Sequence, residues 1–452
     1  MPPVRHRPLL SPGAALGLAL LVLLAPGCSG ETTPVPPTRV VLITLDTLRY
    51  DSVFGDRAVM PRLASRAADG LVFDKFFSAT SSTQPTHASL FTGLHPWQHG
   101  VSRNGMVLRA GFDTLAERFS DAGWSTSAVV ASFPLDRRFL FHQGFDRYDD
   151  VMTEAHVKHT EAWNNVEMGD GNFYSLAEHV SGEALRQIDE AEGEHQFFWF
   201  HYFDPHAPYG DTAGGERIEL NDLRLAIAKG PEAVMQTMAA ARALYDQDIA
   251  RMDEQIERVL ARLDQDADRY ETHVVVTSDH GESWGEDNSY GHRRRVTRYQ
   301  VHVPCIVTGP AVSAGRSDEP AGSVDVYSTL LALARVPGDD DGSGRDLLAP
   351  TGGRPVFAAG MRPSVAKPVQ DPRLNGRSVL VEGDQFFLAR GDGHFIGNPE
   401  RLQGGGNDPD PKLMAEVAAE FAKYQAELRE AESEELIDEE TRAALDALGY
   451  AQ

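Results

Sequence analysis

The sequence predicts an α/β protein in which helices cover both faces of a central, mostly parallel sheet, followed by a small C-terminal α+β subdomain. Two observations support this fold class. Apolar, β-branched runs recur along the chain, as expected for strands buried on both faces of a parallel sheet. Helix-spaced apolar stripes fall between these runs, and this alternation is typical of layered α/β domains.

The first strand is predicted at residues 40–45, which form a continuous apolar run that Asp46 follows directly. Further buried strands are predicted within 125–132, 195–206, 271–281 and 301–310. Residues 231–263 carry apolar side chains at helical spacing and predict a long amphipathic helix. The main α/β domain is therefore expected to span residues 39–345.

The pattern of apolar and charged residues changes in residues 346–452. Residues 377–396 consist of short apolar runs separated by Gly-Asp pairs, which predict antiparallel strands joined by tight turns. The acidic segment that follows is helical in pattern, and its charges are typical of a solvated helix face. Together these elements predict the α+β subdomain.

The N-terminus has the layout of a signal peptide, with two arginines before an apolar run that is too short to span a bilayer comfortably. The ending "APGC" resembles a bacterial lipobox, with Ala25 where leucine is usual. This resemblance implies removal of residues 1–27, lipidation of Cys28 and anchoring in the bacterial cell envelope, with residues 28–38 as a tether. Plain secretion and an uncleaved anchor are the alternatives, and no later segment is predicted to span a membrane.

Composition excludes several classes of protein. The 452-residue chain carries a formal net charge of -25, which argues against a nucleic-acid partner because phosphate binding needs clustered lysine and arginine. With two cysteines, it has no disulfide framework and no cysteine-based zinc site. Cys305 lies in an apolar run and is expected to be a core residue.

Two predicted strands end in side chains that bind metals. Asp46 follows the first strand, and Asp279 and His280 follow the strand in 271–281. The carboxyl ends of parallel strands meet at one sheet edge, where a single divalent ion can take two carboxylates and one imidazole. A metal there would also activate the hydroxyl of Thr83, which without one is a turn residue.

Several spaced segments, in order, resemble the motifs of sulfatases within the alkaline-phosphatase superfamily. They are "LITLDTLRYDSV", "TQPTHASLFTGLHPWQHGV", "TLAERFSDAGWSTSAVVAS", "QGFDRYDD", "FHYFDPHAPY", "TSDHGESWGEDNSYGH", "VDVYSTLLALARVPG" and "ALDALGY". The resemblance extends from about residue 39 to the C-terminus. It implies an alkaline-phosphatase-like fold and a metal-dependent ester hydrolase.

The resemblance also shows two departures at the reaction centre. Thr83 stands where sulfatases have the Cys or Ser that is oxidised to formylglycine, and His87 replaces an arginine that steadies that aldehyde. Threonine carries a methyl group on Cβ and cannot give the aldehyde, so no formylglycine is expected. Thr83 instead resembles the nucleophile of nucleotide pyrophosphatase/phosphodiesterases and lipoteichoic acid synthases, in which a metal-bound threonine attacks phosphorus.

Further roles follow from the same resemblance. Asn104 falls where phosphodiesterases and phosphonate monoester hydrolases place an asparagine that stabilises the charged oxygens. His206 matches a histidine that holds the non-bridging oxygens of the substrate, and His87 is assigned to substrate binding as well. His292 matches a position near the leaving group and is expected to act as the general acid.

The metal content is expected to be one divalent ion, held by Asp46, Asp279, His280 and the Thr83 oxygen, with Mn, Zn, Ca and Mg all compatible. Asp204 and His201 are candidate ligands of a second metal. Arg49 is expected either to pair with a carboxylate near Asp46 or to contact the substrate.

The sequence therefore favours a hydrolase or transferase of phosphate esters, phosphodiesters above all, that uses Thr83 as its nucleophile. Sulfate-ester hydrolysis without formylglycine is one alternative, and a non-catalytic, lipid-anchored binding protein is another. The expected substrate is a small-molecule, glycan-linked or lipid-linked ester.

Overall fold

The computed structural model describes residues 36–155, 172–210, 217–286, 290–292, 296–310, 312–338 and 344–349, and the strand segments 356–359, 377–382, 385–390 and 395–397. The predicted signal peptide, Cys28 and the acidic C-terminal helix lie outside these ranges and stay predictions. Within the described ranges, no helix is both long enough and apolar enough to cross a membrane.

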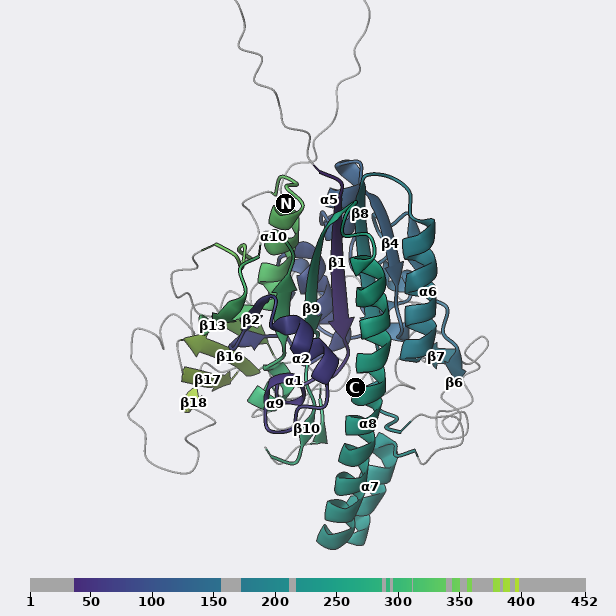
Figure 1. The fold of residues 1–452 in the computed structure, drawn as a ribbon. Coiled ribbons are helices and arrows are strands. Elements are labelled where there is room, and N and C mark those ends of the chain that lie inside the picture. Colours follow the sequence, from purple (N-terminus) through teal and green to yellow (C-terminus); the bar gives the residue numbers. More distant parts are fainter. Residues whose placement is uncertain are drawn as a thin grey trace, which may run out of the picture. The chain divides into compact units, whose positions relative to one another are not determined.

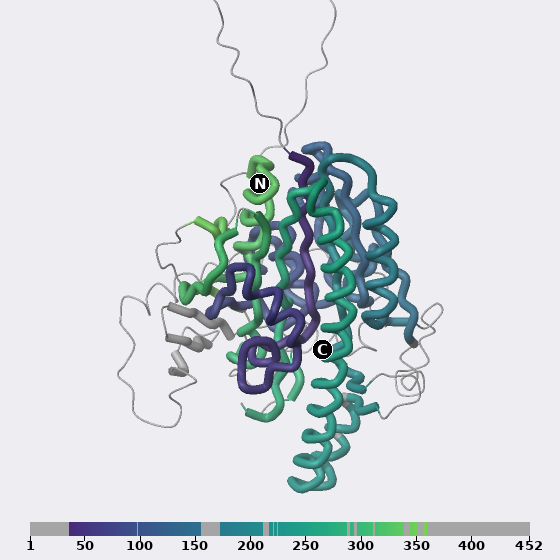
Figure 2. The backbone as a smooth tube through the Cα atoms, in the orientation of Figure 1, coloured from purple at the N-terminus to yellow at the C-terminus, as the bar shows by residue number. Residues whose placement is uncertain are grey.

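A mixed sheet of eight strands forms the centre of the fold (Figure 1). Its spatial order is β13 (Gly315–Ser317), β2 (Leu71–Phe73), β12 (Cys305–Thr308), β9 (Glu271–Ser278), β1 (Thr38–Leu45), β8 (His195–Tyr202), β4 (Ser125–Val129) and β5 (Arg147–Asp149). The first strand of the chain, β1, pairs in parallel with both β8 and β9. Segments that are more than 150 residues apart in sequence thus lie side by side at the centre (Figure 2).

Helices pack on both faces of this sheet. The helices of the described residues are α1 (Asp51–Phe54), α2 (Pro61–Ala67), α3 (Thr83–Thr92), α4 (Pro96–His99), α5 (Leu115–Asp121), α6 (Ala177–Glu190), α7 (Leu220–Lys229), α8 (Pro231–Asp264), α9 (Arg298–Val301) and α10 (Ser323–Leu333), of which α7 packs against α8. Val40 and Leu42 of β1 belong to the core shared with α3, α5 and α10, whereas Val41 and Ile43 belong to the core shared with α2, α6 and α8. Because successive side chains of a strand point to opposite faces, a strand between two helical layers must be apolar throughout. The predicted α/β/α layering is confirmed.

The predicted long helix and strands form close to their expected bounds. Residues 231–263 correspond to α8, which extends one residue further. The strand expected within 301–310 forms as β12, but it runs antiparallel to both β9 and β2. An apolar run shows that a strand is buried on both faces, although it does not encode the direction of the strand. Cys305 is fully buried in β12, as expected for a core residue.

Shorter elements complete the fold. Two-stranded sheets are formed by β3 (Phe76–Phe77) with β14 (Ala321–Gly322), β6 (Glu154–Ala155) with β7 (Asn172–Tyr174), and β10 (Ser283–Trp284) with β11 (Tyr290–Gly291). Single 3-10 turns span η1 (Phe133–Leu135) and η2 (Arg137–Phe139). A four-stranded antiparallel sheet contains β15 (Val356–Ala359), β16 (Arg377–Glu382), β17 (Gln385–Arg390) and β18 (Phe395–Gly397). The antiparallel strands predicted within 377–396 are therefore present.

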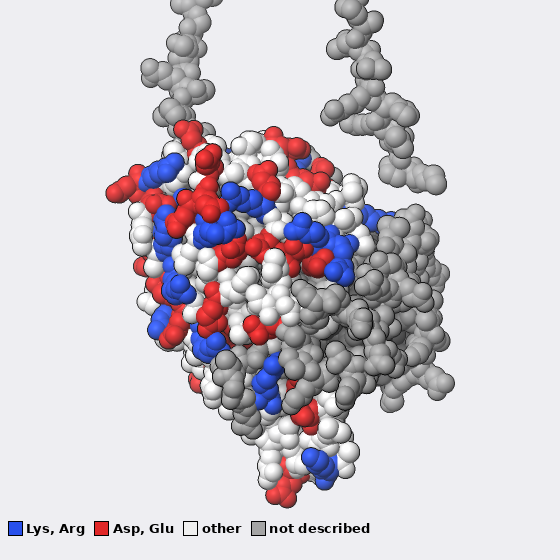
Figure 3. Space-filling view, turned by 90° about the vertical axis from the view of Figure 1, so that its right-hand side faces the viewer, with Lys and Arg blue, Asp and Glu red and all other residues white. Residues whose placement is uncertain are grey.

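Charged side chains of both signs are interspersed on the face that Figure 3 shows. On α6, for example, the carboxylate of Glu190 accepts from Arg147 at 2.8 Å and from Arg186 at 2.7 Å. Such exposed pairs are screened by salt and contribute little to stability.

Candidate active site

The parallel pairing of β1 with β9 brings the predicted metal ligands together. Leu45 and Ser278 are partners in this register, so Asp46 and Asp279 follow the two strands at the same sheet edge. Asp46, Asp279 and His280 are fully buried, and each offers a ligand atom within 4.8 Å of the other two. The predicted carboxylate–carboxylate–imidazole cluster therefore exists in the fold.

The imidazole of His280 is oriented as a metal ligand. Its Nδ1 lies 3.2 Å from the Gly281 carbonyl oxygen, which can only accept, so Nδ1 carries the proton. Its Nε2 then presents a lone pair and lies 3.6 Å from an oxygen of Asp46 and 3.5 Å from an oxygen of Asp279. Metal-binding histidines typically donate their other N–H to a backbone carbonyl in this way.

Asp279 divides its two oxygens between structure and site. Oδ1 accepts from the backbone N–H groups of Thr47 at 3.3 Å and His280 at 2.8 Å. Oδ2 has no hydrogen-bond partner among the described residues and faces the cluster. Thr47 itself has a φ of 57°, which is a costly conformation for a β-branched residue and typical of functional sites.

The electrostatics of this cluster favour a bound cation. Burial raises the pKa of Asp279 well above its ordinary value, and the neighbouring Asp46 raises it further. Two buried carboxyl groups and an imidazole lone pair repel one another when they converge without positive charge. A divalent ion removes that repulsion and uses the lone pairs that the fold directs to one point, so these residues fit a metal.

His201, at the end of β8, is oriented differently. Its Nδ1 accepts from the backbone N–H of Ala131 at 3.3 Å, which places the proton of the neutral ring on Nε2. That Nε2 lies 3.6 Å from the carboxylate of Asp46, and burial lowers the pKa of His201 to about 3. In this tautomer Nε2 of His201 has no lone pair for the second metal that the sequence raised as an alternative.

Both ring nitrogens of His87 are engaged within the protein. Nδ1 donates to the Thr83 carbonyl oxygen at 2.8 Å, and Nε2 accepts from the Thr44 hydroxyl at 3.1 Å. Trp199 donates in turn to that hydroxyl at 2.9 Å. Burial and the nearby His201 lower the pKa of His87 well below its ordinary value, so the ring is neutral. His87 thus holds the first turn of α3, and its predicted contact with substrate stays a prediction.

Thr83 begins α3, immediately after the extended residue Ser82. Its side-chain hydroxyl is fully buried and has no hydrogen-bond partner among the described residues. At the other end of the helix Gly93 has a φ of 67°, and a Cβ there would lie 3.0 Å from the Tyr327 ring. The Thr-Gly ending of the motif thus reflects a left-handed helix C-cap packed closely against α10.

Asn104 contacts the two residues that flank Thr83. Its Oδ1 accepts from the Ser82 hydroxyl at 3.1 Å and from the Gln84 backbone N–H at 2.8 Å, on either side of Thr83. Its Nδ2 is buried without a hydrogen-bond partner among the described residues. The Gln84 side chain fixes this arrangement, because it accepts from the Met106 N–H and donates to the Pro134 carbonyl.

The two remaining predicted histidines lie next to each other and next to the cluster. The His206 and His292 ring centroids are 5.1 Å apart, and the His292 ring lies 4.3 Å from that of His280. His206 directs Nδ1 to the Ala207 carbonyl oxygen at 2.6 Å. His292 directs Nδ1 to the carboxylate of Glu282 at 3.1 Å, a contact that the sequence analysis missed.

Arg49 and Asp204 lie in different surroundings. Arg49 makes a bidentate pair with Asp51, at 2.7 and 2.8 Å, and contacts Glu286 at 2.6 Å, so it pairs with carboxylates.

Asp204 accepts from the Ala177 N–H at the start of α6, at 3.1 Å. Burial raises the pKa of Asp204 to about 8, and no described acidic or histidine side chain completes a metal cluster around it.

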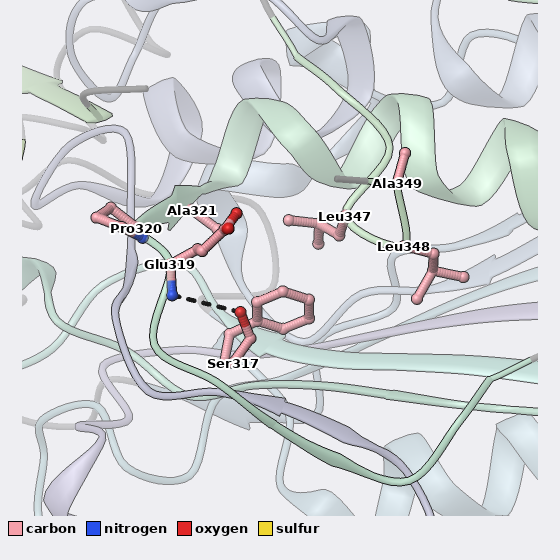
Figure 4. Close-up of a pocket in the computed structure, with 8 residues that line it drawn as sticks. Ser317, Glu319, Pro320, Ala321, Leu347, Leu348 and Ala349 are labelled. Atoms are coloured by element: carbon pink, nitrogen blue, oxygen red, sulfur yellow. Dashed lines mark hydrogen bonds between the residues drawn. The ribbon is translucent and has the colours of Figure 1, made fainter. Parts of the chain in front are cut away.

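Figure 4 shows a surface pocket of about 250 Å³. Its lining consists of Phe73, Ser317, Glu319, Pro320, Ala321, Leu347, Leu348 and Ala349. None of the predicted site residues contributes to it, and its charged side chain is a single glutamate.

Comparison with known sequences identifies a family and several relatives. The family model described as Sulfatase matches residues 38–336, about two thirds of the chain. An uncharacterized sulfatase of Escherichia coli strain K12 is 26% identical over 325 residues, which cover 63% of this chain and 65% of that protein. N-acetylgalactosamine-6-sulfatase of Homo sapiens is 25% identical over 359 residues, which cover 68% of this chain and 64% of that protein. The chain thus spans just under two thirds of the length of these two relatives.

Solved structures show the same fold. A phosphonate monoester hydrolase from Silicibacter pomeroyi superposes with a TM-score of 0.63 at 20% identity, covering 88% of this chain and 96% of that chain. A 2-O glycosaminoglycan sulfatase superposes with a TM-score of 0.64 at 14% identity, covering 88% and 93%. The fold, the strand-edge cluster and the family match agree, and the chain belongs to the sulfatase family of ester hydrolases, within the alkaline-phosphatase superfamily.

Proposed function

We propose that this protein is a metal-dependent hydrolase of phosphate esters, phosphodiesters above all, with Thr83 as its nucleophile. The observation that carries the proposal is the Thr83 hydroxyl, which is fully buried and without a hydrogen-bond partner among the described residues. His87 connects it to the cluster, because its Nδ1 bonds the Thr83 carbonyl and lies 3.8 Å from Asp279. A buried hydroxyl without a partner is costly unless a ligand satisfies it.

Asp46, Asp279 and His280 would hold the divalent ion, and the Thr83 oxygen completes the proposed ligand set. When bound, that ion supplies positive charge that favours the ionised hydroxyl of Thr83 and polarises the ester. The identity of the ion is open, because carboxylate and imidazole ligands suit Mn, Zn, Ca and Mg.

The residues of the chain account for the reaction in two steps. Thr83 Oγ1 attacks phosphorus in line, forming a bond to phosphorus as the bond to the leaving oxygen breaks. The Asn104 amide, the His206 ring and the N-terminus of α3 stabilise the negative charge on the phosphoryl oxygens. His292 gives a proton to the leaving oxygen, and then takes one from the water or acceptor alcohol that releases the phosphoryl group from Thr83.

Substitution of Thr83 by alanine tests this proposal. We expect at least about a 1,000-fold loss of turnover on an aryl phosphodiester, since the substitution removes the hydroxyl that acts as nucleophile. The purified variant should still bind metal through its three remaining ligands. Thr92→Ala, at the other end of the same helix, is the matched control and should stay active. Full activity of Thr83→Ala would overturn the assignment.

Sulfate-ester hydrolysis is the second candidate, because the family model and the curated relatives carry the sulfatase name. The methyl group of Thr83 excludes formylglycine, so Thr83 itself would then have to attack sulfur. Rates on 4-nitrophenyl sulfate and on a phosphodiester with the same leaving group separate the two reactions. A higher kcat/KM on the sulfate would show that the protein is a sulfate-ester hydrolase.

We further propose that the protein is anchored in a bacterial cell envelope through lipidated Cys28 and acts there on small-molecule, glycan-linked or lipid-linked esters. The lipobox-like "APGC" supports the anchor, and the structural similarity to a 2-O glycosaminoglycan sulfatase supports a glycan-linked ester. Labelling with a palmitate analogue should mark the wild-type protein and spare Cys28→Ser. Equal labelling of both would contradict the anchor.

A further inference from the structure

A fully buried carboxylate, Glu282, lies between two groups of the site and has no place in the mechanism above. One of its oxygens lies 3.1 Å from Nδ1 of His292, and the other accepts from the Tyr209 hydroxyl at 3.0 Å. We propose that Glu282 is a positioning residue that fixes the tautomer and orientation of His292 for protonation of the leaving group. This inference rests on the proposed function and extends it.

The local backbone explains why these two side chains meet. Strands β10 and β11 pair antiparallel, with Ser283 opposite Gly291, so that Glu282 and His292 are the next opposed pair. Directly opposed side chains on one face of such a ribbon lie within contact distance. Gln300 holds the two strands together, because its side-chain amide donates to the Ser283 hydroxyl at 2.9 Å and to the Gly291 carbonyl at 3.2 Å.

The position of Glu282 is fixed from two further directions. The Arg49 guanidinium donates to the Glu282 backbone carbonyl at 3.1 Å. Gly281 donates its N–H to the Gln300 carbonyl at 2.8 Å and lies so close to the Tyr299 backbone that a Cβ would approach it to 2.3 Å. The carboxylate therefore has little freedom to follow a different orientation of the His292 ring.

The contact with Glu282 decides which nitrogen of His292 serves the reaction. Glu282 accepts from the Tyr209 hydroxyl, and in the same acceptor role toward His292 it makes Nδ1 the donor. Nε2 is then the nitrogen that exchanges a proton with the leaving oxygen, in a ring whose centroid lies 4.3 Å from that of His280 and 5.1 Å from that of His206. As the phosphorus–oxygen bond breaks, the Nε2 proton passes to the leaving oxygen and its bonding pair stays on Nε2. The Tyr209 hydroxyl keeps the second carboxylate oxygen occupied throughout.

A leaving-group series tests this role. Glu282→Gln keeps the size of the side chain but loses the obligate acceptor, and we expect about a 10-fold loss on a 4-nitrophenyl phosphodiester and about a 100- to 1,000-fold loss on the phenyl ester. The difference arises because a poor leaving group depends more strongly on protonation. Glu286→Gln removes a carboxylate from the same segment without contact to His292 in the described structure, and should leave the dependence on leaving group as in wild type.

Combination with His292→Ala provides the decisive control. In the His292→Ala background, Glu282→Gln should add no further leaving-group dependence if the two residues act as one unit. A loss that is equal for both esters, or fully additive with His292→Ala, would overturn the positioning role. If Glu282→Gln does not fold, Tyr209→Phe offers a milder test with a smaller change of the same sign, and no change at all would count against the proposal. Wild-type protein without phosphodiesterase activity would instead refute the proposed function itself.

Discussion

Two sides of the site are built in different ways. The cation side consists of Asp46, Asp279 and His280, which follow directly from adjacent parallel strands. The leaving-group side consists of His206, Glu282 and His292. His206 lies on a loop, whereas Glu282 and His292 flank the short β10–β11 pairing. A ligand set at strand ends is positioned by the sheet register alone. A loop histidine needs a dedicated partner such as Glu282 to hold its tautomer.

The largest effect is expected on the cation side, from Asp279→Asn. This nearly isosteric change removes one of the two buried carboxylates, so metal affinity should fall by more than the 10- to 100-fold (about 1.4–2.7 kcal/mol) typical of an outer-sphere partner, and turnover with it. In metal-free protein, by contrast, Asp279→Asn should stabilise the fold, because it relieves the repulsion between Asp46 and Asp279.

Calorimetry with and without a chelator checks both expectations. The metal-free variant should unfold at a higher temperature than metal-free wild type, and metal should stabilise the wild type far more than the variant. A variant that binds metal as tightly as wild type would show that Asp279 is not a ligand.

Asn104 holds the residues on either side of Thr83, and its substitution is expected to have the next largest effect. Asn104→Ala removes the amide donor and should lower kcat about 100- to 1,000-fold. Asn104→Asp keeps the acceptor that holds Ser82 and the Gln84 N–H, so its thermal stability should stay close to wild type while activity is lost. Retained activity in Asn104→Asp would assign Asn104 to the cap of α3 alone.

The contrast between the two sides also explains what the sequence could predict. Asp46, Asp279 and His280 are local signals, since each ends a recognisable apolar run. Glu282 was missed because its partner His292 is ten residues away and meets it only through the β10–β11 pairing. A search for a carboxylate and a histidine flanking a short Gly-containing hairpin could have found the pair.

Hydrogen-bond direction could not be predicted at all. His201 and His280 both sit near strand ends, yet one accepts from the Ala131 N–H and the other donates to the Gly281 carbonyl. These partners are backbone groups, which nearly every residue type provides, so the residue types in the sequence do not indicate them. The direction of β12 could not be predicted for a similar reason, because a strand that is buried on both faces has the same apolar pattern whether it runs parallel or antiparallel to its neighbours.

His201→Gln sharpens the distinction between a ligand and its neighbour. Because Nε2 of His201 carries a proton and faces Asp46, we expect the variant to bind one equivalent of metal with at most about a 10- to 100-fold weaker affinity. His280→Gln should lose stoichiometric binding under the same conditions. Metal analysis of the two purified variants gives the comparison, and two equivalents in wild type but one in His201→Gln would restore the second metal.

The smallest effect on turnover is expected from Asp204→Asn, which tests the loop of the leaving-group side. Burial first of all, together with the nearby Asp248 and Glu178, raises the pKa of Asp204 from its ordinary value of 3.8 to about 8. The folded protein therefore keeps the Asp204 proton between pH 4 and 8, where the unfolded chain has lost it. Stability from this group is fully present below pH 4 and is lost as pH rises toward 8, with a slope of at most about 1.4 kcal/mol per pH unit.

Asp204→Asn lacks this proton and should remove that part of the pH dependence while keeping an acceptor for the Ala177 N–H. Urea unfolding at several pH values, with metal bound, measures the free energy of unfolding of both proteins. The advantage of wild type over the variant should shrink, or reverse, as pH rises from 4 to 8. Parallel curves would mean that Asp204 ionises normally in the fold, and the loop that carries His206 would then be no more sensitive to pH than the metal-bound strand ends.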